Sequence, residues 1–479
     1  MFDLEINSIG DSDSYKSGHA FAYPPGMQFL STYAEARSRK RWNYHMVMGL
    51  QSWLMKLKPI TTGDVSAMED LMMKHCGVFN RQGWDAIVNE CGGILPLEIE
   101  ALPEGMIVPV GTPSYQIKNT RAGFGWVPQY VETPALRAVW YASTVGTLSW
   151  HVKQSIRAAL EISADESEAK LNFSLHDFGA RGASSAQTAA LGGMAHLVNF
   201  NGSDTIPALL AAQEFYGADV AAFNIPALEH STVCAWGEDR EVDCYANAID
   251  RFLTQRGPGS LLSIVPDAYD FRHAVDVHLG LTLRQQIKSS GGKVVVRPDS
   301  GDPAQEVVFA LNSLAKNFGY TVNSKGYKVL APCTGVIQGD GITEETIGQL
   351  LTTIMTNGFS VENMAFGMGG GLLQSVTRDT LGWAQKANAV TGGHGPWIGI
   401  QKRPATAASK TSKKGVQMVI ENEQGIAEAA PLGSFGSERN ILKPVWRDGE
   451  LLVKWTLQDL RANSNKYRLI NGDLVNISR

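Results

Sequence analysis

The stretch Lys293-Val294-Val295-Val296-Arg297-Pro298-Asp299-Ser300-Gly301-Asp302-Pro303 joins a β-branched run to a polar turn. Three consecutive valines are typical of a strand that is buried on both faces, as in a parallel sheet. Such a strand delivers Arg297 and Asp299 into the turn that follows it. An arginine there can bind a phosphate or a carboxylate, and an aspartate can hold a ribose hydroxyl or a Mg²⁺-bound water. The alternative is a strand end with a purely structural ion pair.

Similar runs recur through the middle of the chain, with helical patterns between them. The runs begin about 23 to 42 residues apart, which is the length of a strand plus a crossover helix. They lie at 197–200, 220–225, 261–265, 293–296, 335–338 and 364–366, and helical patterns occupy 206–216 and 342–357. This alternation predicts an α/β fold with a parallel sheet covered by helices.

The two flanks have a different pattern. Residues 1–170 mix an expected helix at 41–57 with a short strand near 106–110, and β-prone runs at 416–420 and 451–455 predict an antiparallel layer in 387–479. The segment 402–414 is rich in Lys, Ala, Ser and Thr, and we expect a mobile basic loop there. The chain thus divides into an N-terminal part (1–170), an α/β part (171–386) and a C-terminal part (387–479).

Composition excludes several classes of protein. With 42 basic and 47 acidic residues the net charge is −5, so no basic excess points to nucleic acid. The five cysteines form no C-x-x-C pair, which argues against a disulfide framework or a zinc site and favours a reducing cytoplasm. We find no signal-peptide pattern at residues 1–5 and no spanning stretch of apolar residues, so we expect a cytoplasmic enzyme without a membrane partner.

Polar residues gather just after the predicted strands. Asp204, His230, Asp267 and Asp340 each lie a few residues beyond a β-prone run. Because α/β folds place ligands at the carboxyl ends of parallel strands, these residues predict one site assembled from five or six strand ends. Simpler explanations exist for single residues: a lone histidine is more often packed or solvated than catalytic, and Thr343 can cap a helix that follows a glycine turn.

Two glycine-containing stretches suggest what the site binds. Phe366-Gly367-Met368-Gly369-Gly370-Gly371 offers backbone N–H groups suited to a phosphate, although it is not the dinucleotide fingerprint. Leu175-His176-Asp177-Phe178-Gly179-Ala180-Arg181-Gly182 places an aromatic ring and a guanidinium side by side, which suits a planar ring. The alternatives are a flexible turn for the first stretch and a core Phe with a surface Arg for the second.

Taken together, these segments resemble the nicotinamide phosphoribosyltransferases, type II enzymes of the nicotinate phosphoribosyltransferase superfamily. The similarity begins at Asp13-Ser14-Tyr15-Lys16 and Tyr23-Pro24-Pro25 and continues through 178–188, 195–205, 229–237, 297–301, 323–330, 336–341 and 366–379 to the lysines of 402–414. It implies an irregular, TIM-like α/β barrel over 171–386. It also implies a second α+β domain with an antiparallel layer, built from both termini.

The resemblance implies a reaction and its participants. Nicotinamide and 5-phosphoribosyl pyrophosphate would give nicotinamide mononucleotide and pyrophosphate for NAD salvage, with Mg²⁺ as cofactor and ATP as co-substrate. Phe178 and Tyr15 resemble the aromatic pair that sandwiches the pyridine ring, with Tyr15 supplied by the partner subunit of a homodimer. Arg181 and Asp204 resemble the contacts to the carboxamide oxygen and NH₂ group.

The remaining roles concern the sugar and its phosphates. His230 resembles a histidine that ATP phosphorylates transiently. Asp267 resembles the acid that lies near Mg²⁺. The pyrophosphate itself would supply most of the ligands of this ion. The residues matching the phosphoribosyl site are Arg297, Asp299, Gly339, Asp340, Gly369 and Gly370. The residues matching a basic clamp for phosphate and pyrophosphate, part of it across the dimer interface, are Arg37, Arg378, Lys386, Lys402 and Lys410, with Lys413 and Lys414 as equal candidates in the loop.

Three alternatives and three departures remain. A related enzyme acting on nicotinate or quinolinate would be favoured by a basic residue in place of Asp204. A non-catalytic nucleotide-binding protein on this fold, or a barrel isomerase of a phosphorylated sugar, would not need the ring pocket and the charged set together. The departures are Asn224 and Pro266, where the family has serines, and Gly335, near which it has a basic residue.

Overall fold

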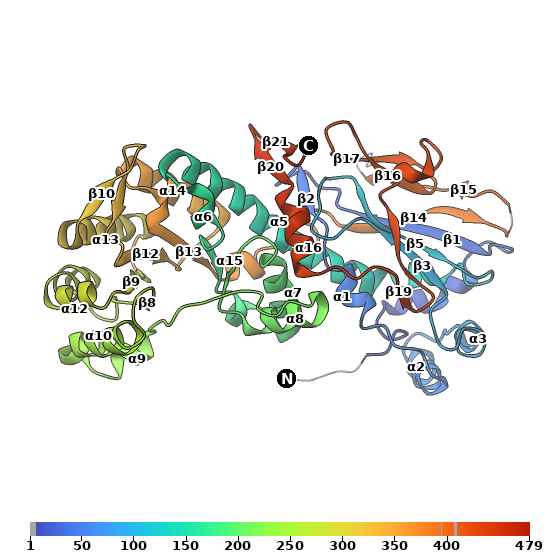
Figure 1. Cartoon of the computed structure of the whole chain (residues 1–479). Helices are drawn as coiled ribbons and strands as arrows, with labels where there is room; N and C mark the ends of the chain where they lie inside the picture. The colour runs from blue at the N-terminus through green and yellow to red at the C-terminus, as the bar shows by residue number, and fades with distance from the viewer. Residues whose placement is uncertain (1–5, 394, 407–409) are drawn as a thin grey trace. The chain divides into compact units, whose positions relative to one another are not determined.

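The computed structural model describes residues 6–393, 395–406 and 410–479 (Figure 1). It forms two compact units. Unit 1 comprises Met1–Thr147, Glu214–Ala218 and Val376–Arg479, and unit 2 comprises Leu148–Gln213 and Asp219–Ser375. The division falls inside the long helix α5 (Glu132–Ser163), whereas the sequence placed the corresponding boundaries at 170 and 386. Strand β14 (Ala384–Thr391) pairs with β1 (Phe29–Glu35), which draws residues 384–386 into unit 1.

Unit 2 is built on a six-stranded sheet in which every pairing is parallel. Its strand order is β7 (Gly202–Ser203), β6 (Leu175–Asp177), β13 (Met364–Met368), β12 (Thr334–Gln338), β9 (Lys293–Val296) and β8 (Leu261–Ile264). Parallel bridges from Phe223 to Gly202 and from Ala227 to Ser263 attach one connecting segment to both edge strands. The sheet is therefore curled, and the predicted α/β fold with a parallel sheet is confirmed.

Helices lie between these strands in the chain. The predicted helices at 206–216 and 342–357 are α8 (Ile206–Tyr216) and α14 (Glu344–Thr356). The other regular elements of unit 2 are α6 (Ser167–Leu171), α7 (Ala186–His196), α9 (His230–Cys234), α10 (Glu241–Ile249), α11 (Phe271–His273), α12 (Arg284–Ser289), α13 (Pro303–Phe318), α15 (Gly370–Leu373), β10 (Tyr320–Val322) and β11 (Lys328–Leu330).

Two predicted strands of unit 2 were wrong, and the strands β6, β7, β10 and β11 were missed. Residues 197–200 are buried but follow the end of α7, and residues 220–225 contribute only the single bridge at Phe223. Apolar burial under a turn gives the same local sequence pattern as a short strand. Strand β6 has only one apolar residue among Leu175, His176 and Asp177, so its sequence carried no strand pattern.

Unit 1 is built on a seven-stranded antiparallel sheet. Its order is β15 (Ile398–Gly399), β14, β1, β5 (Pro113–Asn119), β3 (Leu97–Ala101), β18 (Lys443–Arg447) and β19 (Glu450–Leu451). Three two-stranded sheets are β2 (Tyr44–Met46) with β4 (Ile107–Pro109), β16 (Gln417–Glu421) with β17 (Ala427–Pro431), and β20 (Tyr467–Ile470) with β21 (Asp473–Asn476). The helices are α1 (Leu50–Leu54), α2 (Thr62–His75), α3 (Arg81–Cys91), α4 (Val127–Tyr130) and α16 (Leu457–Asn465).

The predicted antiparallel pairing in the C-terminal part is present at β16, but two expectations for unit 1 need correction. The expected helix at 41–57 is only α1, because Tyr44–Met46 pairs with β4 instead. The strand expected at 451–455 ends at Leu451. Throughout the described ranges, no helix is both long and apolar enough to cross a membrane.

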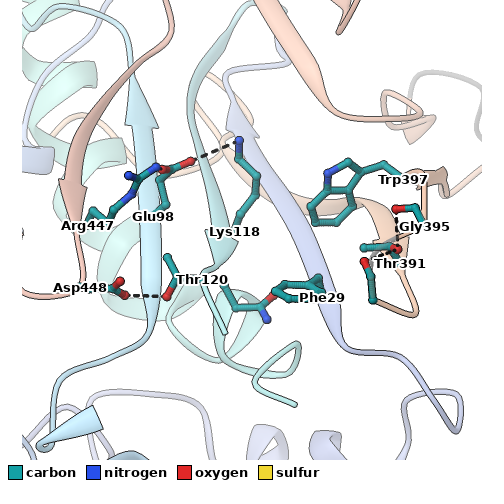
Figure 2. A pocket seen from close by; sticks show the side chains of 11 residues that line it. Phe29, Glu98, Lys118, Thr120, Thr391, Gly395, Trp397, Arg447 and Asp448 are labelled. Carbon is teal, nitrogen blue, oxygen red and sulfur yellow. Dashed lines mark hydrogen bonds and ion pairs between the residues drawn. The ribbon is translucent and has the colours of Figure 1, made fainter. Parts of the chain in front are cut away.

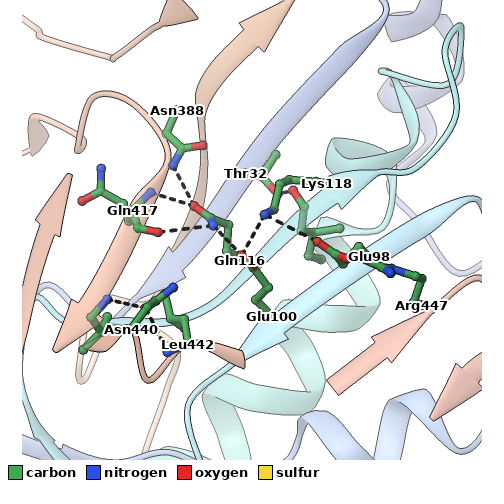
Figure 3. Close-up of polar contacts among 12 residues, drawn as sticks. Thr32, Glu98, Glu100, Gln116, Lys118, Asn388, Gln417, Asn440, Leu442 and Arg447 are labelled. Carbon is green, nitrogen blue, oxygen red and sulfur yellow. Dashed lines mark hydrogen bonds and ion pairs between the residues drawn. The ribbon is translucent and has the colours of Figure 1, made fainter. Parts of the chain in front are cut away.

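The buried amide of Gln116 joins several strands of unit 1 (Figure 3). Its Oε1 accepts from the backbone N–H of Gln417 at 3.0 Å and from Asn388 Nδ2 at 3.3 Å. Its Nε2 donates to Glu100 Oε2 at 2.8 Å. One side chain on β5 thus connects β3, β14 and β16, which lie far apart in the sequence.

We predict that Gln116→Ala lowers the stability of unit 1 by about 3 kcal/mol, because buried partners lose their hydrogen bonds. Differential scanning calorimetry should record a transition several degrees lower than in the parent protein. Gln424→Ala, at an exposed glutamine, is the control and should leave the transition unchanged. Equal transitions for the two variants would contradict the structural role of Gln116.

Candidate active site

Phe178 lies at the carboxyl end of β6, where its ring packs against two glycines of neighbouring strand ends. Its backbone N–H donates to Met368 O at 3.0 Å, which anchors it to β13. A Cβ added at Gly367 would lie 2.0 Å from Phe178 Cε2, and one added at Gly339 would lie 3.1 Å from it. Any larger residue at 367 would therefore displace the ring. The sequence predicted Gly339 and Gly367 as phosphate-turn residues and missed this contact with the ring.

Two charged residues expected near the ring lie in short turns that follow neighbouring strands. Arg181 lies in a 3₁₀ turn (Ala180–Gly182), and Asp204 follows β7 with its N–H donating to Asp177 O at 2.9 Å. Burial raises the pKa of Asp204, while Arg297 and Arg181 lower it. The structure thus brings one carboxylate within electrostatic reach of two arginines.

His230 and Asp267 form a direct pair. His230 is the first residue of α9, and its Nε2 lies 2.8 Å from Asp267 Oδ1. The Asp267 side chain is 3% exposed and that of His230 is 45% exposed. A buried carboxylate therefore orients an imidazole that is open to reactants, which is the arrangement used to activate a nucleophilic or proton-transferring histidine.

Asp299 lies among the other charges of the predicted site. Burial raises the pKa of Asp299, Arg297 and His230 lower it, and Asp267 and Asp340 raise it. Arg297 Nη2 lies 3.7 Å from Asp299 Oδ2. Arg297 Nε is buried without a hydrogen-bond partner in the part of the chain that the structure describes.

The glycine turn after β13 closes the same end of the sheet. A Cβ added at Gly371 would lie 2.4 Å from Ile342 O, and one at Gly182 would lie 3.7 Å from Gly370 Cα. At Gly370 itself an added Cβ would meet nothing within 4 Å, so that face of the turn is open. Thr343 Oγ1 accepts from Thr346 N at 3.2 Å, which shows that the glycine turn after β12 also serves as a helix start.

The predicted basic residues belong to unit 1, and three of them act on the pKa of a fourth, Lys386. The pKa of Lys386 is lowered by burial and by the charges of Arg37, Lys402 and Arg378, while Glu132 raises it. Such a repulsive group of cations is typical of a site that binds a polyanion.

The structure describes Tyr15 and all of the loop 402–414 except three residues. Residues 407–409 of the loop lie outside the described residues, next to Lys410. Lys402 and Ser412 hydrogen-bond to each other through backbone atoms at 2.9 Å. Lys413 Nζ is paired with Glu35 Oε2 at 2.5 Å, so its charge is already balanced. Tyr15, in unit 1, is 64% exposed.

A hollow of about 490 Å³ on the unit 1 sheet does not share these properties (Figure 2). Phe29 and Trp397 line it together with Lys118, Arg447 and Asp448. Lys118 pairs with Glu98 and Glu100, Arg447 pairs with Glu98, and Asp448 accepts from Thr120 Oγ1 at 2.6 Å. Since these charged groups already have protein partners, the polar ends of the unit 2 strands are the better candidate.

Comparison with known proteins shows the family of the chain. The model of the nicotinate phosphoribosyltransferase (NAPRTase) family matches residues 173–437, and that of the nicotinamide phosphoribosyltransferase N-terminal domain matches residues 7–99. The chain belongs to the nicotinate phosphoribosyltransferase family. The first match alone covers more than half of the chain and includes all the unit 2 residues described above.

Named relatives and solved structures extend the similarity over nearly the full length. A Xanthomonas campestris pv. campestris (strain 8004) protein named nicotinamide phosphoribosyltransferase is 44% identical, covering 97% of this chain and 99% of its own. One from Acinetobacter baylyi with the same name is 29% identical, with 96% and 97% covered. The fold is similar to a Pyrococcus furiosus nicotinate-nucleotide pyrophosphorylase (TM-score 0.63, 16% identity, 97% and 98% covered) and to human nicotinic acid phosphoribosyltransferase (0.56, 16%, 95% and 92%).

Asp177 is a site neighbour that the sequence did not single out. It is fully buried at the end of β6, and burial raises its pKa to about 6. The Gly179 N–H and Thr205 lower that pKa, and Asp204 raises it. No motif marks this residue, because a strand-end aspartate beside Phe178 gives no sign of its burial.

We predict that Asp177→Asn flattens the pH dependence of stability. The folded pKa is raised, so the stability contributed by the protonated carboxyl is present below the unfolded pKa and is lost as pH rises through about 6. The free energy of unfolding falls by about 3 kcal/mol by neutral pH in the parent protein. The Asp177→Asn variant does not lose this stability, because its amide does not titrate. Denaturant unfolding at several values between pH 4.5 and 7.5 measures the difference. Asp239→Asn, at an exposed position, is the control; a parallel curve for Asp177→Asn would disprove the raised pKa.

Proposed function

We propose that this chain is an enzyme that transfers the phosphoribosyl group of 5-phosphoribosyl pyrophosphate to nicotinamide, as a step of NAD salvage. The observation that carries the proposal is the Phe178 ring against Gly367 together with Asp204 and Arg181 in the turns at the same end of the sheet, since a planar ring bearing an amide needs these partners. Membership of the family and the names of the full-length relatives support the same reaction. The charges around Asp299 would act where the bond between C1 of the ribose and the pyrophosphate oxygen breaks.

The chemistry requires no protein nucleophile at the sugar. Pyrophosphate leaves C1 of the ribose with the bonding electron pair, and the lone pair of the pyridine nitrogen forms the new bond to C1. Asp299 and Asp340 would position the ribose and stabilise the positive charge that develops on it. Arg297, with its unsatisfied Nε, and the open face of Gly370 would bind the 5-phosphate. No proton has to move in this step.

Asp204 would set the preference for nicotinamide over nicotinate. Its carboxylate accepts a hydrogen bond from an amide NH₂ group but repels a carboxylate, at a cost of about 2–5 kcal/mol in a buried site. Arg181 supplies the complementary donor for the carbonyl oxygen. A basic residue at 204 would reverse this preference, and that is the arrangement we associate with the nicotinate or quinolinate alternative.

The leaving group would be held by the basic residues of unit 1. The clamp consists of Arg37, Arg378, Lys386, Lys402 and Lys410, of which Arg37, Arg378 and Lys402 are close enough to Lys386 to lower its pKa. Mg²⁺ would be bound mainly through pyrophosphate oxygens, with Asp267 as its protein ligand, and would neutralise the departing charge. The described residues hold no group of three metal-ligating side chains, which fits an ion that substrate oxygens mainly coordinate.

We further propose a homodimer in which each site uses Tyr15 of the partner subunit as the second face of the pyridine sandwich. The exposure of this aromatic side chain supports that role. We also propose that the curled sheet is the irregular, TIM-like barrel of the family and that the protein acts in the cytoplasm. The segment bridging both edge strands supports the barrel, and five unbridged cysteines suit a reducing compartment.

ATP would act through His230. The γ-phosphoryl group would pass to an imidazole nitrogen with ADP as leaving group, and water would later release phosphate from the histidine. Asp267, at 2.8 Å from Nε2, would stabilise the positive charge on the ring and leave the second nitrogen to attack. The pair is therefore the proposed link between ATP hydrolysis and product formation.

We predict that purified protein with 5-phosphoribosyl pyrophosphate and Mg²⁺ converts nicotinamide, but not nicotinate, to its mononucleotide. Asp204→Asn removes the repelling charge and should shift the ratio of the two kcat/KM values at least tenfold towards nicotinate. Chromatography of the products with each substrate gives both results. Preferential conversion of nicotinate by the parent protein would overturn the role of Asp204, and no product from either would overturn the enzymatic function.

We also predict that His230→Ala retains weak basal activity and loses its stimulation by ATP. The measurement is the rate of nicotinamide mononucleotide formation with and without ATP, together with ADP release. His75→Ala, at an exposed histidine of α2, is the matched control and should keep full stimulation. If His230→Ala were stimulated as strongly as the control, ATP would not act through this histidine.

A further inference from the structure

The carboxyl group of Asp177 has no part in phosphoribosyl transfer, yet it occupies the centre of the pyridine end of the site. It is fully buried on β6, between β13 and β7, and its chain neighbour is Phe178. Burying an acid in this way is costly unless its oxygens are used.

Asp177 contacts both turns that carry the ring-binding residues. Its Oδ1 accepts from the backbone N–H of Gly179 at 2.7 Å, within the turn that leads from Phe178 to Arg181. Its main-chain oxygen accepts from the N–H of Asp204 at 2.9 Å, in the turn after β7. One residue therefore fixes the stacking ring, the guanidinium and the amide-binding carboxylate relative to one another.

The second carboxyl oxygen, Oδ2, lies near Gly193 of α7 and near Thr205, the residue before α8. A Cβ added at Gly193 of α7 would lie 2.7 Å from Oδ2, and the Thr205 hydroxyl is near enough to lower the pKa of Asp177. Neither Oδ2 nor Thr205 Oγ1 has a partner at hydrogen-bond geometry within the described ranges. On the other side, a Cβ at Gly179 would lie 3.0 Å from Oδ1. Two glycines thus leave room for this carboxyl group and for nothing larger.

We propose that Asp177 is a positioning residue for the pyridine substrate: its carboxyl group holds the turn 178–182 through the Gly179 N–H, on the strand whose main-chain oxygen binds Asp204, and so sets the geometry of Phe178 and Arg181 relative to Asp204. The proposal rests on the proposed function, and it concerns the pyridine alone. The phosphoribosyl site is built on the ends of β9, β12 and β13 and does not depend on the Asp177 side chain. Loss of the carboxyl group should therefore weaken one substrate and not the other.

The test is a comparison of steady-state KM values. Asp177→Ala should raise the KM for nicotinamide at least tenfold and change that for 5-phosphoribosyl pyrophosphate by less than threefold. Asp177→Asn should restore the nicotinamide KM to within threefold of the parent value, because its amide oxygen can accept from the Gly179 N–H. Thr205→Val, which removes the hydroxyl beside Oδ2 without changing shape, should give an intermediate increase of about three- to tenfold and serves if Asp177→Ala does not fold.

Two controls separate positioning from general damage. Asn363→Ala removes a buried hydrogen-bonding side chain at the amino end of the same sheet, where Oδ1 accepts from Leu330 N at 2.8 Å, and should lower stability without changing the nicotinamide KM. Thr334→Val is the matched control for Thr205 at another buried threonine of the sheet. An equal rise of both KM values, an unchanged nicotinamide KM in Asp177→Ala or in Thr205→Val, or an Asn variant as impaired as the Ala variant would overturn the proposal. An inactive parent protein would instead overturn the proposed function itself.

Discussion

The contact between the Phe178 ring and the backbone of Gly367 is the constraint on which the rest of the site depends. A ring can lie directly over a strand end only where the strand has no side chain, and the added Cβ at 367 would penetrate the ring at 2.0 Å. Gly339 on β12 gives the ring its second neighbour. The turns after β6 and β7 carry Arg181 and Asp204 at the same end of the sheet, and Arg181 is close enough to lower the pKa of Asp204.

The charges at this end of the sheet are held in place by burial and by one another. Asp204, Asp299 and Asp177 all have a pKa raised by burial, and arginines oppose the shift at the first two. In surroundings of low polarity such charges act on a substrate more strongly than they would in water. Asp267 uses its burial differently, since it holds the exposed imidazole of His230. One end of the sheet thus combines the Phe178 ring with the charged residues that we propose bind a sugar phosphate.

Much of this arrangement could be predicted from the sequence, because strand-end residues in a parallel sheet share one edge. That rule predicted Arg297, Asp299 and Asp340 as candidates after β9 and β12, and β9, β12 and α14 formed where their patterns placed them. His230 was predicted from a strand at 220–225 that the structure does not contain. The predictions for 197–200 and 41–57 were wrong. The first segment is a buried turn and the second contains a short paired strand, and contacts distant in the sequence decide both. No local sequence motif indicated the burial of Asp177 or the contact between Gly367 and the Phe178 ring. The basic residues of unit 1 and Tyr15 were found only through resemblance to the family, because no local pattern links them to the sheet of unit 2.

The most direct test of the account is a crystal structure of the protein with nicotinamide mononucleotide bound. The account predicts that the pyridine ring stacks on the face of Phe178 opposite Gly367, with its amide between Arg181 and Asp204 and its phosphate near Gly370 and Arg297. A mononucleotide bound elsewhere, or one whose pyridine ring makes no contact with Phe178, would contradict it.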